Sequence, residues 1–121
     1  MTLRAAYLAA LVALAPVAPA AAQGTMASSD GVILRGLDKI SGETTDLEVS
    51  VGESVEFARL EISLIACRFP ADDPSADAFA FLDITDARRG EQLFRGWMIA
   101  SSPALNALDH ARYDVWVIGC Q

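Results

Sequence analysis

Polar and apolar side chains alternate strictly along residues 45–51, which read Thr-Asp-Leu-Glu-Val-Ser-Val. A period of two gives an extended chain one apolar and one polar face, whereas a helix would mix the two kinds. The alternation resumes at residues 55–57 and continues through 60–67. Between the first two segments, Gly52-Glu53 is compatible with a tight hairpin turn. This part of the chain therefore predicts half-buried β-strands.

Four further apolar segments have the length and composition of strands, at residues 32–37, 78–84, 93–100 and 113–120. The last of them is apolar on both faces, which predicts a position in the middle of a sheet. Before it, a serine and a proline resemble the start of a helix, so one short helical turn is expected over 104–108. We therefore expect an all-β fold, a compact sandwich or barrel of six to seven short antiparallel strands with one short helical turn.

The amino-terminal segment has the three-part layout of a secretory signal peptide. One basic residue, Arg4, precedes an apolar run over 5–15, and small side chains end the segment before Gln23. Cleavage between Ala22 and Gln23 is predicted, with cleavage after Ala20 as the alternative. A retained membrane anchor is the competing interpretation. The run is short for a membrane span, however, two prolines follow it, and no basic cluster comes after them.

The predicted organisation is a signal peptide over 1–22, a flexible tail of small residues over 23–31 and a single β domain over 32–121. Removal of the signal leaves 99 of the 121 residues, and the loss of Arg4 takes the formal charge from −7 to −8. Such an acidic domain repels phosphate backbones and anionic lipid, which argues against nucleic-acid binding and peripheral membrane attachment. We also expect no stable membrane insertion after cleavage. The expected location is the periplasm.

Cys67 and Cys120 are the only cysteines of the chain. An oxidising compartment and an even count favour a structural disulfide. A metal site is the alternative, but it requires further Cys or His ligands, and His110 is the only histidine. We therefore expect a Cys67–Cys120 disulfide to close the β domain, and we expect no cofactor.

Two groups of polar residues could carry chemistry. Ser101 or Ser102 with His110 could form a hydrolytic site, although the chain has no Gly-x-Ser-x-Gly nucleophile elbow. The three aspartates within 72–77 could gather calcium. They lack the spacing, the glycine and the closing glutamate of an EF-hand loop, so a solvated acidic loop is the preferred interpretation.

The carboxy-terminal part of the chain resembles a known family. Residues 96–105 read Gly-Trp-Met-Ile-Ala-Ser-Ser-Pro-Ala-Leu, followed by Ala-Leu-Asp-His at 107–110 and Tyr-Asp-Val-Trp-Val at 113–117. This run resembles the signature of domain-of-unknown-function family 2155, small exported proteins of alphaproteobacteria. Leu-Asp-Lys-Ile, Val-Gly-Glu and Ala-Cys-Arg in the earlier half, and the closing Cys120, are similar too, while Ala111 stands where proline is expected. The resemblance implies an exported Gram-negative envelope protein without established catalytic residues.

The leading hypothesis for function is a non-catalytic periplasmic module that binds a protein of the envelope. Its basis is the segment around Trp97, which is dense in aromatic and sulfur-containing residues of the kind enriched at interfaces. The candidate partner-binding residues are Arg95, Trp97, Met98, Ser101, Ser102 and His110. The alternative is a small periplasmic hydrolase using Ser101 or Ser102 with His110, so enzymatic activity stays open and is the less favoured class. A small-ligand carrier ranks lower, because a domain of this size has little volume to spare for a cavity. The sequence does not specify an oligomeric state.

Overall fold

The computed structural model describes residues 2–6, 8–16 and 24–121. Within these ranges the chain forms eight strands and no helix, and every strand pair is antiparallel. The all-β prediction is therefore confirmed. The strands are β1 (Met26–Ser29), β2 (Gly31–Asp38), β3 (Thr44–Ser50), β4 (Ser54–Phe57), β5 (Leu60–Pro70), β6 (Phe79–Asp86), β7 (Gln92–Ile99) and β8 (Tyr113–Cys120).

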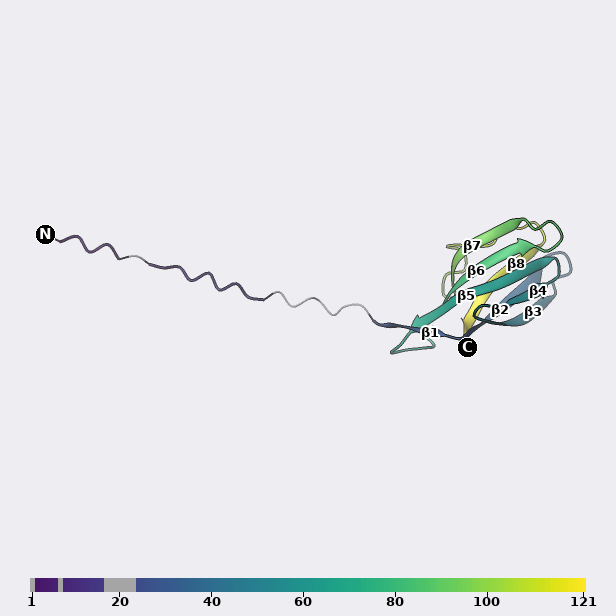
Figure 1. Cartoon of the computed structure of the whole chain (residues 1–121), viewed down its shortest axis with the longest axis horizontal. Coiled ribbons are helices and arrows are strands. Elements are labelled where there is room, and N and C mark those ends of the chain that lie inside the picture. The colour runs from purple at the N-terminus through teal and green to yellow at the C-terminus, as the bar shows by residue number, and fades with distance from the viewer. Residues whose placement is uncertain (1, 7, 17–23) are drawn as a thin grey trace.

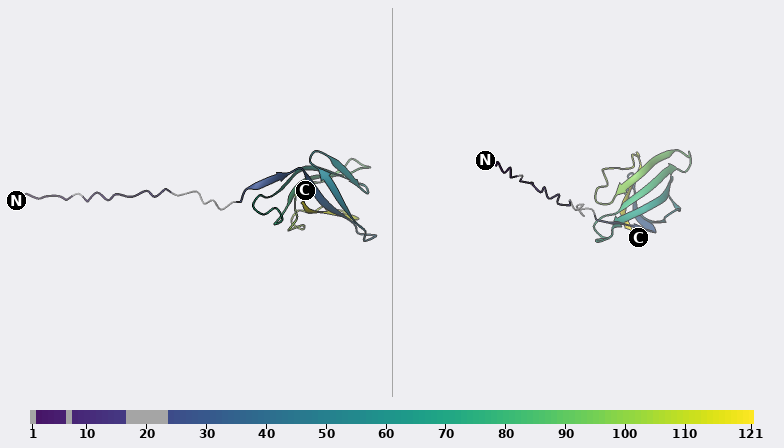
Figure 2. Two further views of the ribbon diagram at one scale, coloured as in Figure 1. Left: turned by 90° about the horizontal axis from the view of Figure 1, so that it is seen from below. Right: turned by 60° about the vertical axis from the view of Figure 1, so that its left-hand side comes forward.

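The strands form two sheets that pack as a sandwich. β1, β5, β6 and β7 are hydrogen-bonded in that order, and β4 pairs with the first half of β5 to complete a five-stranded sheet. β3, β2 and β8 form the second, three-stranded sheet. Figure 1 shows β5, β6 and β7 in one layer with β2, β3 and β8 behind them, and Figure 2 shows the same two layers from other sides.

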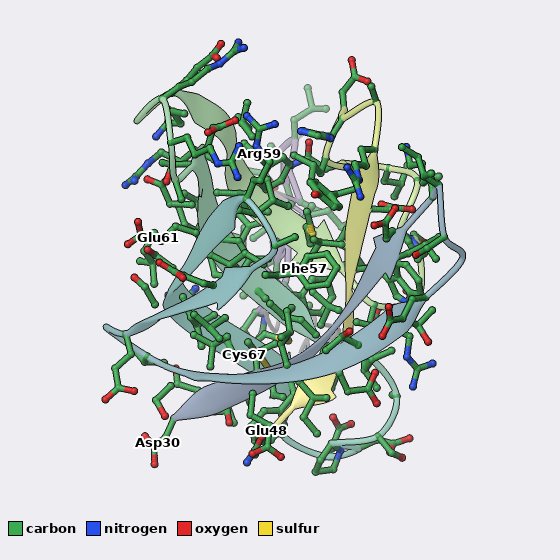
Figure 3. All side chains as sticks on the ribbon, turned by 90° about the vertical axis from the view of Figure 1, so that its right-hand side faces the viewer. Asp30, Glu48, Phe57, Arg59, Glu61 and Cys67 are labelled. Carbon is green, nitrogen blue, oxygen red and sulfur yellow. A yellow bond between two sulfur atoms is a disulfide. The ribbon has the colours of Figure 1, made fainter. Side chains whose placement is uncertain are left out.

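The core lies between the sheets and consists of every second residue of the long strands. Its largest fully buried side chains are aliphatic: Leu34 from β2, Leu60, Ile62 and Leu64 from β5, and Leu82 and Ile84 from β6. The aromatic ring of Phe57 points into the same space (Figure 3) and contacts Tyr113 edge to face, with 5.7 Å between the ring centroids. Gly36 leaves room for that ring, since a Cβ atom there would lie 2.7 Å from it.

A disulfide between Cys67 in β5 and Cys120 in β8 joins the two sheets. The two cysteines are 53 residues apart in the sequence, and Cys67 is fully buried. The prediction of this disulfide is confirmed.

The predicted flexible tail over 23–31 is wrong for the described residues of that range. Met26–Ser29 form β1, which pairs with the end of β5, and Gly31 already belongs to β2. The hydroxyl of Ser29 also donates a hydrogen bond to the backbone carbonyl of Gln121. Small polar residues gave no strand signal, but an exposed edge strand needs no apolar face when its backbone pairs with a neighbour. The predicted cleavage point between Ala22 and Gln23 lies outside the described residues.

The predicted helical turn over 104–108 is also wrong. The backbone N–H of Leu105 donates to the carbonyl of Ser102, and this single turn does not continue as a helix. Downstream, the side chain of Asn106 donates to the carbonyl of Trp97, and Leu108 is buried in the core. These tertiary contacts hold the segment in an irregular conformation. No helix among the described residues has the length and apolar character needed to cross a membrane.

Two expectations about strand neighbours are corrected. β8 lies at the end of the three-stranded sheet and not in its middle. Its outward Trp116 and the loop that contains Pro103 together line a hollow on the surface. Gly52 does make a turn, with φ +83°, but the turn carries the chain from one sheet to the other. The tight hairpin instead joins β4 to β5 through Ala58-Arg59, where Ala58 has φ +51°.

Candidate functional site

Aromatic side chains gather on the outer surface of the five-stranded sheet. Alternation along β6 buries Ala80 and Leu82 completely and turns Phe79 and Phe81 to the opposite, outer side. Phe81 pairs with Trp97 of β7, and their rings meet edge to face at a centroid distance of 5.2 Å. Aromatic pairs of this geometry stabilise by about 0.5–1.5 kcal/mol beyond their buried area. The rings are only half-buried, so part of each stays open to contact.

Two arginines extend over these rings. The guanidinium carbon of Arg68 in β5 lies 5.3 Å from the ring centroid of Trp97, and that of Arg95 in β7 lies 5.4 Å from Phe81. Arg95 also forms a salt bridge with Asp83, with 2.6 Å between nitrogen and oxygen. No salt bridge of Arg68 occurs in residues 24–121.

A shallow hollow of about 290 Å³ lies within this surface, lined by Met26, Arg68, Phe79 and Trp97. Met26 reaches it because β1 pairs with the end of β5, which places Met26 opposite Pro70 and Ser28 opposite Arg68. The hollow is open and has the size of one or two side chains, not of an enclosed small-molecule site. We call Met26, Arg68, Phe79, Phe81, Arg95 and Trp97 together the aromatic face.

The structure brings only two of the six predicted partner-binding residues together. Arg95 and Trp97 lie two positions apart on β7 and both belong to the aromatic face. Met98 points the other way and is 2 % exposed, so it is part of the core. Ser101 and Ser102 lie in the loop after β7, and His110 lies just before β8, so none of the three belongs to the aromatic face.

The residues of the hydrolase alternative are engaged with other groups. The backbone N–H and the hydroxyl of Ser101 both donate to the carboxylate of Asp77, at 3.0 and 2.7 Å. Burial raises the pKa of Asp77, but the hydrogen bonds from Ser101 and from the N–H of Ala78 outweigh it and hold the pKa below its usual value. This arrangement ties the loop after β7 to the segment before β6.

The imidazole ring of His110 also forms hydrogen bonds with other groups. Its Nδ1 accepts hydrogen bonds from the backbone N–H groups of Arg112 and Tyr113, at 3.0 and 3.1 Å. A neutral ring in this state carries its proton on Nε2, so it has no free lone pair with which to accept a serine proton. We find no hydrogen bond between His110 and Ser101 or Ser102 in the described part of the chain.

The acidic loop before β6 does not assemble ligands either. Asp73 accepts a hydrogen bond from Ser75, and Asp77 faces Ser101. Within residues 24–121 no three histidine, cysteine or carboxylate side chains lie close enough together to hold a metal ion. A larger hollow of about 510 Å³ lies beside this loop. Its polar lining includes Ser75, Asp77 and Ser101, and the hydroxyl of each serine donates a hydrogen bond to an aspartate carboxylate.

Four residues of the aromatic face were not among the predicted partner-binding residues: Met26, Arg68, Phe79 and Phe81. The alternation of β6 did place its two phenylalanines on one face. The alternation along β6 does not show which strands lie beside it, because the order of strands in a sheet depends on contacts between distant segments. Met26 lies in a segment of small polar residues that has no alternation typical of a strand.

The fold and this site define a disulfide-closed β-sandwich with an aromatic face on its larger sheet. Residues 32–120 match the family described as "Uncharacterized protein conserved in bacteria" (DUF2155), and the chain belongs to that family. This confirms the resemblance found in the sequence.

A curated relative is similar to the chain over much of the same region. It is the "Uncharacterized protein RP359" of Rickettsia prowazekii (strain Madrid E), 29 % identical over 87 residues. The match covers 69 % of this chain and 56 % of the relative, so the chain spans about half the length of that protein. No solved structure matches the chain.

Proposed function

We propose that this chain is an exported domain of the bacterial envelope that binds another protein through the aromatic face. The observation that carries the proposal is the half-exposed group of Phe79, Phe81 and Trp97 around an open hollow on a sheet surface. Sheet surfaces that face only water are polar, whereas Trp and Arg dominate the binding energy of protein interfaces.

The other sheet of the same molecule provides an internal comparison. Its outer surface carries the ion pair of Arg35 and Asp46, with 2.7 Å between nitrogen and oxygen, and the exposed carboxylate of Glu48 on β3 (Figure 3). The β3 side of that surface has the composition of a solvated face, whereas its β8 side carries the half-buried Trp116 and Ile118, which is 41 % exposed. The contrast between the polar outer side of β3 and the aromatic face supports a binding role for the aromatic face.

Site-specific photo-crosslinking in living cells tests the proposal. Phe79 is replaced by p-benzoylphenylalanine in the complete protein, which keeps an aromatic ring at the edge of the hollow. Illumination is expected to join the protein to one discrete partner, identified by mass spectrometry. The same photoreactive residue at Glu48 is the matched control and is expected to give no such product. Equal labelling from both positions, or no product from Phe79, contradicts the proposal.

Export is part of the proposal and has its own test. It is supported by the signal-peptide pattern over 1–22 and by the Cys67–Cys120 disulfide, which persists in oxidising compartments. Amino-terminal sequencing of the protein purified from cells that make it is expected to begin at Gln23, or at Ala21 if the alternative site is used. An intact Met1 on protein recovered from the cytoplasmic fraction contradicts export.

A further inference from the structure

Arg68 differs from Arg35 and Arg95, the other arginines within the strands. Both of these lie within 4.0 Å of a carboxylate oxygen, as do Arg59 and Arg112 next to the strands, whereas Arg88 and Arg89 on the turn after β6 form no salt bridge among the described residues either. Arg68 lies within this distance of no carboxylate in residues 24–121, and its side chain rests on the ring of Trp97. A guanidinium that lies over an aromatic ring keeps N–H donors available for a further partner.

Of the residues that line the hollow, Arg68 is the charged one. On the aromatic face, Arg95 is paired with Asp83, and the exposed Glu56 and Glu61 lie further along the same outer side of β4 and β5. The carboxylate of Asp83 is already engaged, because it accepts hydrogen bonds from both Arg95 and Gln92. The chain as a whole carries a formal charge of −7, and in residues 24–121 the guanidinium of Arg68 is a cation without an ion pair on this acidic molecule.

The free guanidinium and the apolar hollow adjoin each other, because Arg68 itself lines the hollow with Met26, Phe79 and Trp97. We infer that the partner docks with a segment that places an apolar side chain in the hollow and an Asp or Glu carboxylate against Arg68. Two parallel N–H···O bonds to a carboxylate are the geometry that a guanidinium favours. The acidic remainder of the surface repels such a segment, so charge directs it to this face. The inference rests on the proposed binding function and adds the chemistry of the partner.

Selection of random linear peptides displayed on phage, with the complete protein as bait, tests the inference. The selected peptides are expected to combine Asp or Glu with Phe, Leu, Met or Trp within a few residues. A synthetic peptide of the selected sequence is then measured against Arg68→Gln, which is expected to weaken binding about tenfold, equivalent to about 1.4 kcal/mol. Replacing the acidic residue of the peptide by its amide is expected to give the same loss on the wild type and no further loss on Arg68→Gln.

The control and the contrary outcomes separate the inference from the proposed function. Arg88→Gln, on the turn between β6 and β7, changes the net charge equally and is expected to leave the affinity unchanged. Peptides whose binding is lost in Trp97→Ala but not in Arg68→Gln overturn the inference and leave the binding function intact. Absence of any peptide that depends on Trp97 overturns both. Sedimentation could also show that the wild type is a dimer and that Trp97→Ala is a monomer. The aromatic face would then bind a second copy of the chain, and the inference would likewise be overturned.

Discussion

Removing the disulfide is expected to destabilise the domain strongly. The bond closes a loop of 53 residues, and the chain-entropy relation assigns to such a loop about 4 kcal/mol of stabilisation through the unfolded state. A domain of this size has a total unfolding free energy of about 5–15 kcal/mol, so the loss is a large share of it. The double variant Cys67→Ala with Cys120→Ala avoids leaving a buried free thiol and is the appropriate perturbation.

Urea unfolding followed by tryptophan fluorescence measures the effect. With a slope of about 2 kcal/mol/M, the loss lowers the midpoint of unfolding by roughly 2 M. Wild-type protein kept reduced is the control, and its midpoint is expected to coincide with that of the double variant. A midpoint for the double variant within about 0.5 M of the oxidised wild type would refute the reasoning, because the bond would then not constrain the unfolded chain.

Three smaller changes test other parts of the structure. Gly36→Ala drives a methyl group against the ring of Phe57 and is expected to lower stability by about 1–3 kcal/mol, so an unchanged melting temperature would contradict the packing described. Ala58→Gly relieves the positive φ in the β4–β5 hairpin and is expected to raise stability by about 0.5–1 kcal/mol in urea titration; a loss would contradict it. Asp77→Asn removes a carboxylate whose pKa is lowered by its hydrogen bonds with Ser101, so its stabilisation is present above the unfolded pKa of about 4 and is lost as the pH falls below it. The variant is expected to be less stable at neutral pH and to lose less stability on acidification, and parallel pH profiles of the urea midpoint would refute this.

The strands of this fold were predictable because their local patterns are strong. Alternation from Thr45 to Phe57 and beyond marked the strands whose one face is buried, and the even count of cysteines predicted the link between Cys67 and Cys120. In each case the signal lies within a few residues or in the chemistry of one residue type. The sequence also carried the family resemblance, which rests on a long continuous run.

The features that the sequence did not predict depend on contacts between distant segments. β1 is held by backbone hydrogen bonds to β5 and needs no particular side chains. The segment after Ser102 has helix-start residues, but the bond of Asn106 to Trp97 and the burial of Leu108 override them. The aromatic face follows the same rule, since Arg68 comes to Trp97 only through the order of strands β5, β6 and β7.

The order of strands has a consequence for how the chain folds. β2 pairs with β8, and β1 pairs with the far end of β5, so the two sheets are closed by segments that lie far apart in the sequence. Folds dominated by such distant pairings assemble slowly, on the order of milliseconds to seconds. The five-stranded sheet is complete only when β1 has paired with β5, and the three-stranded sheet only when β2 has paired with β8. The disulfide of Cys67 with Cys120 can form only after β8 has joined the fold. Slow closure is compatible with the proposed export, since a chain that folds slowly is still unfolded when it reaches the membrane.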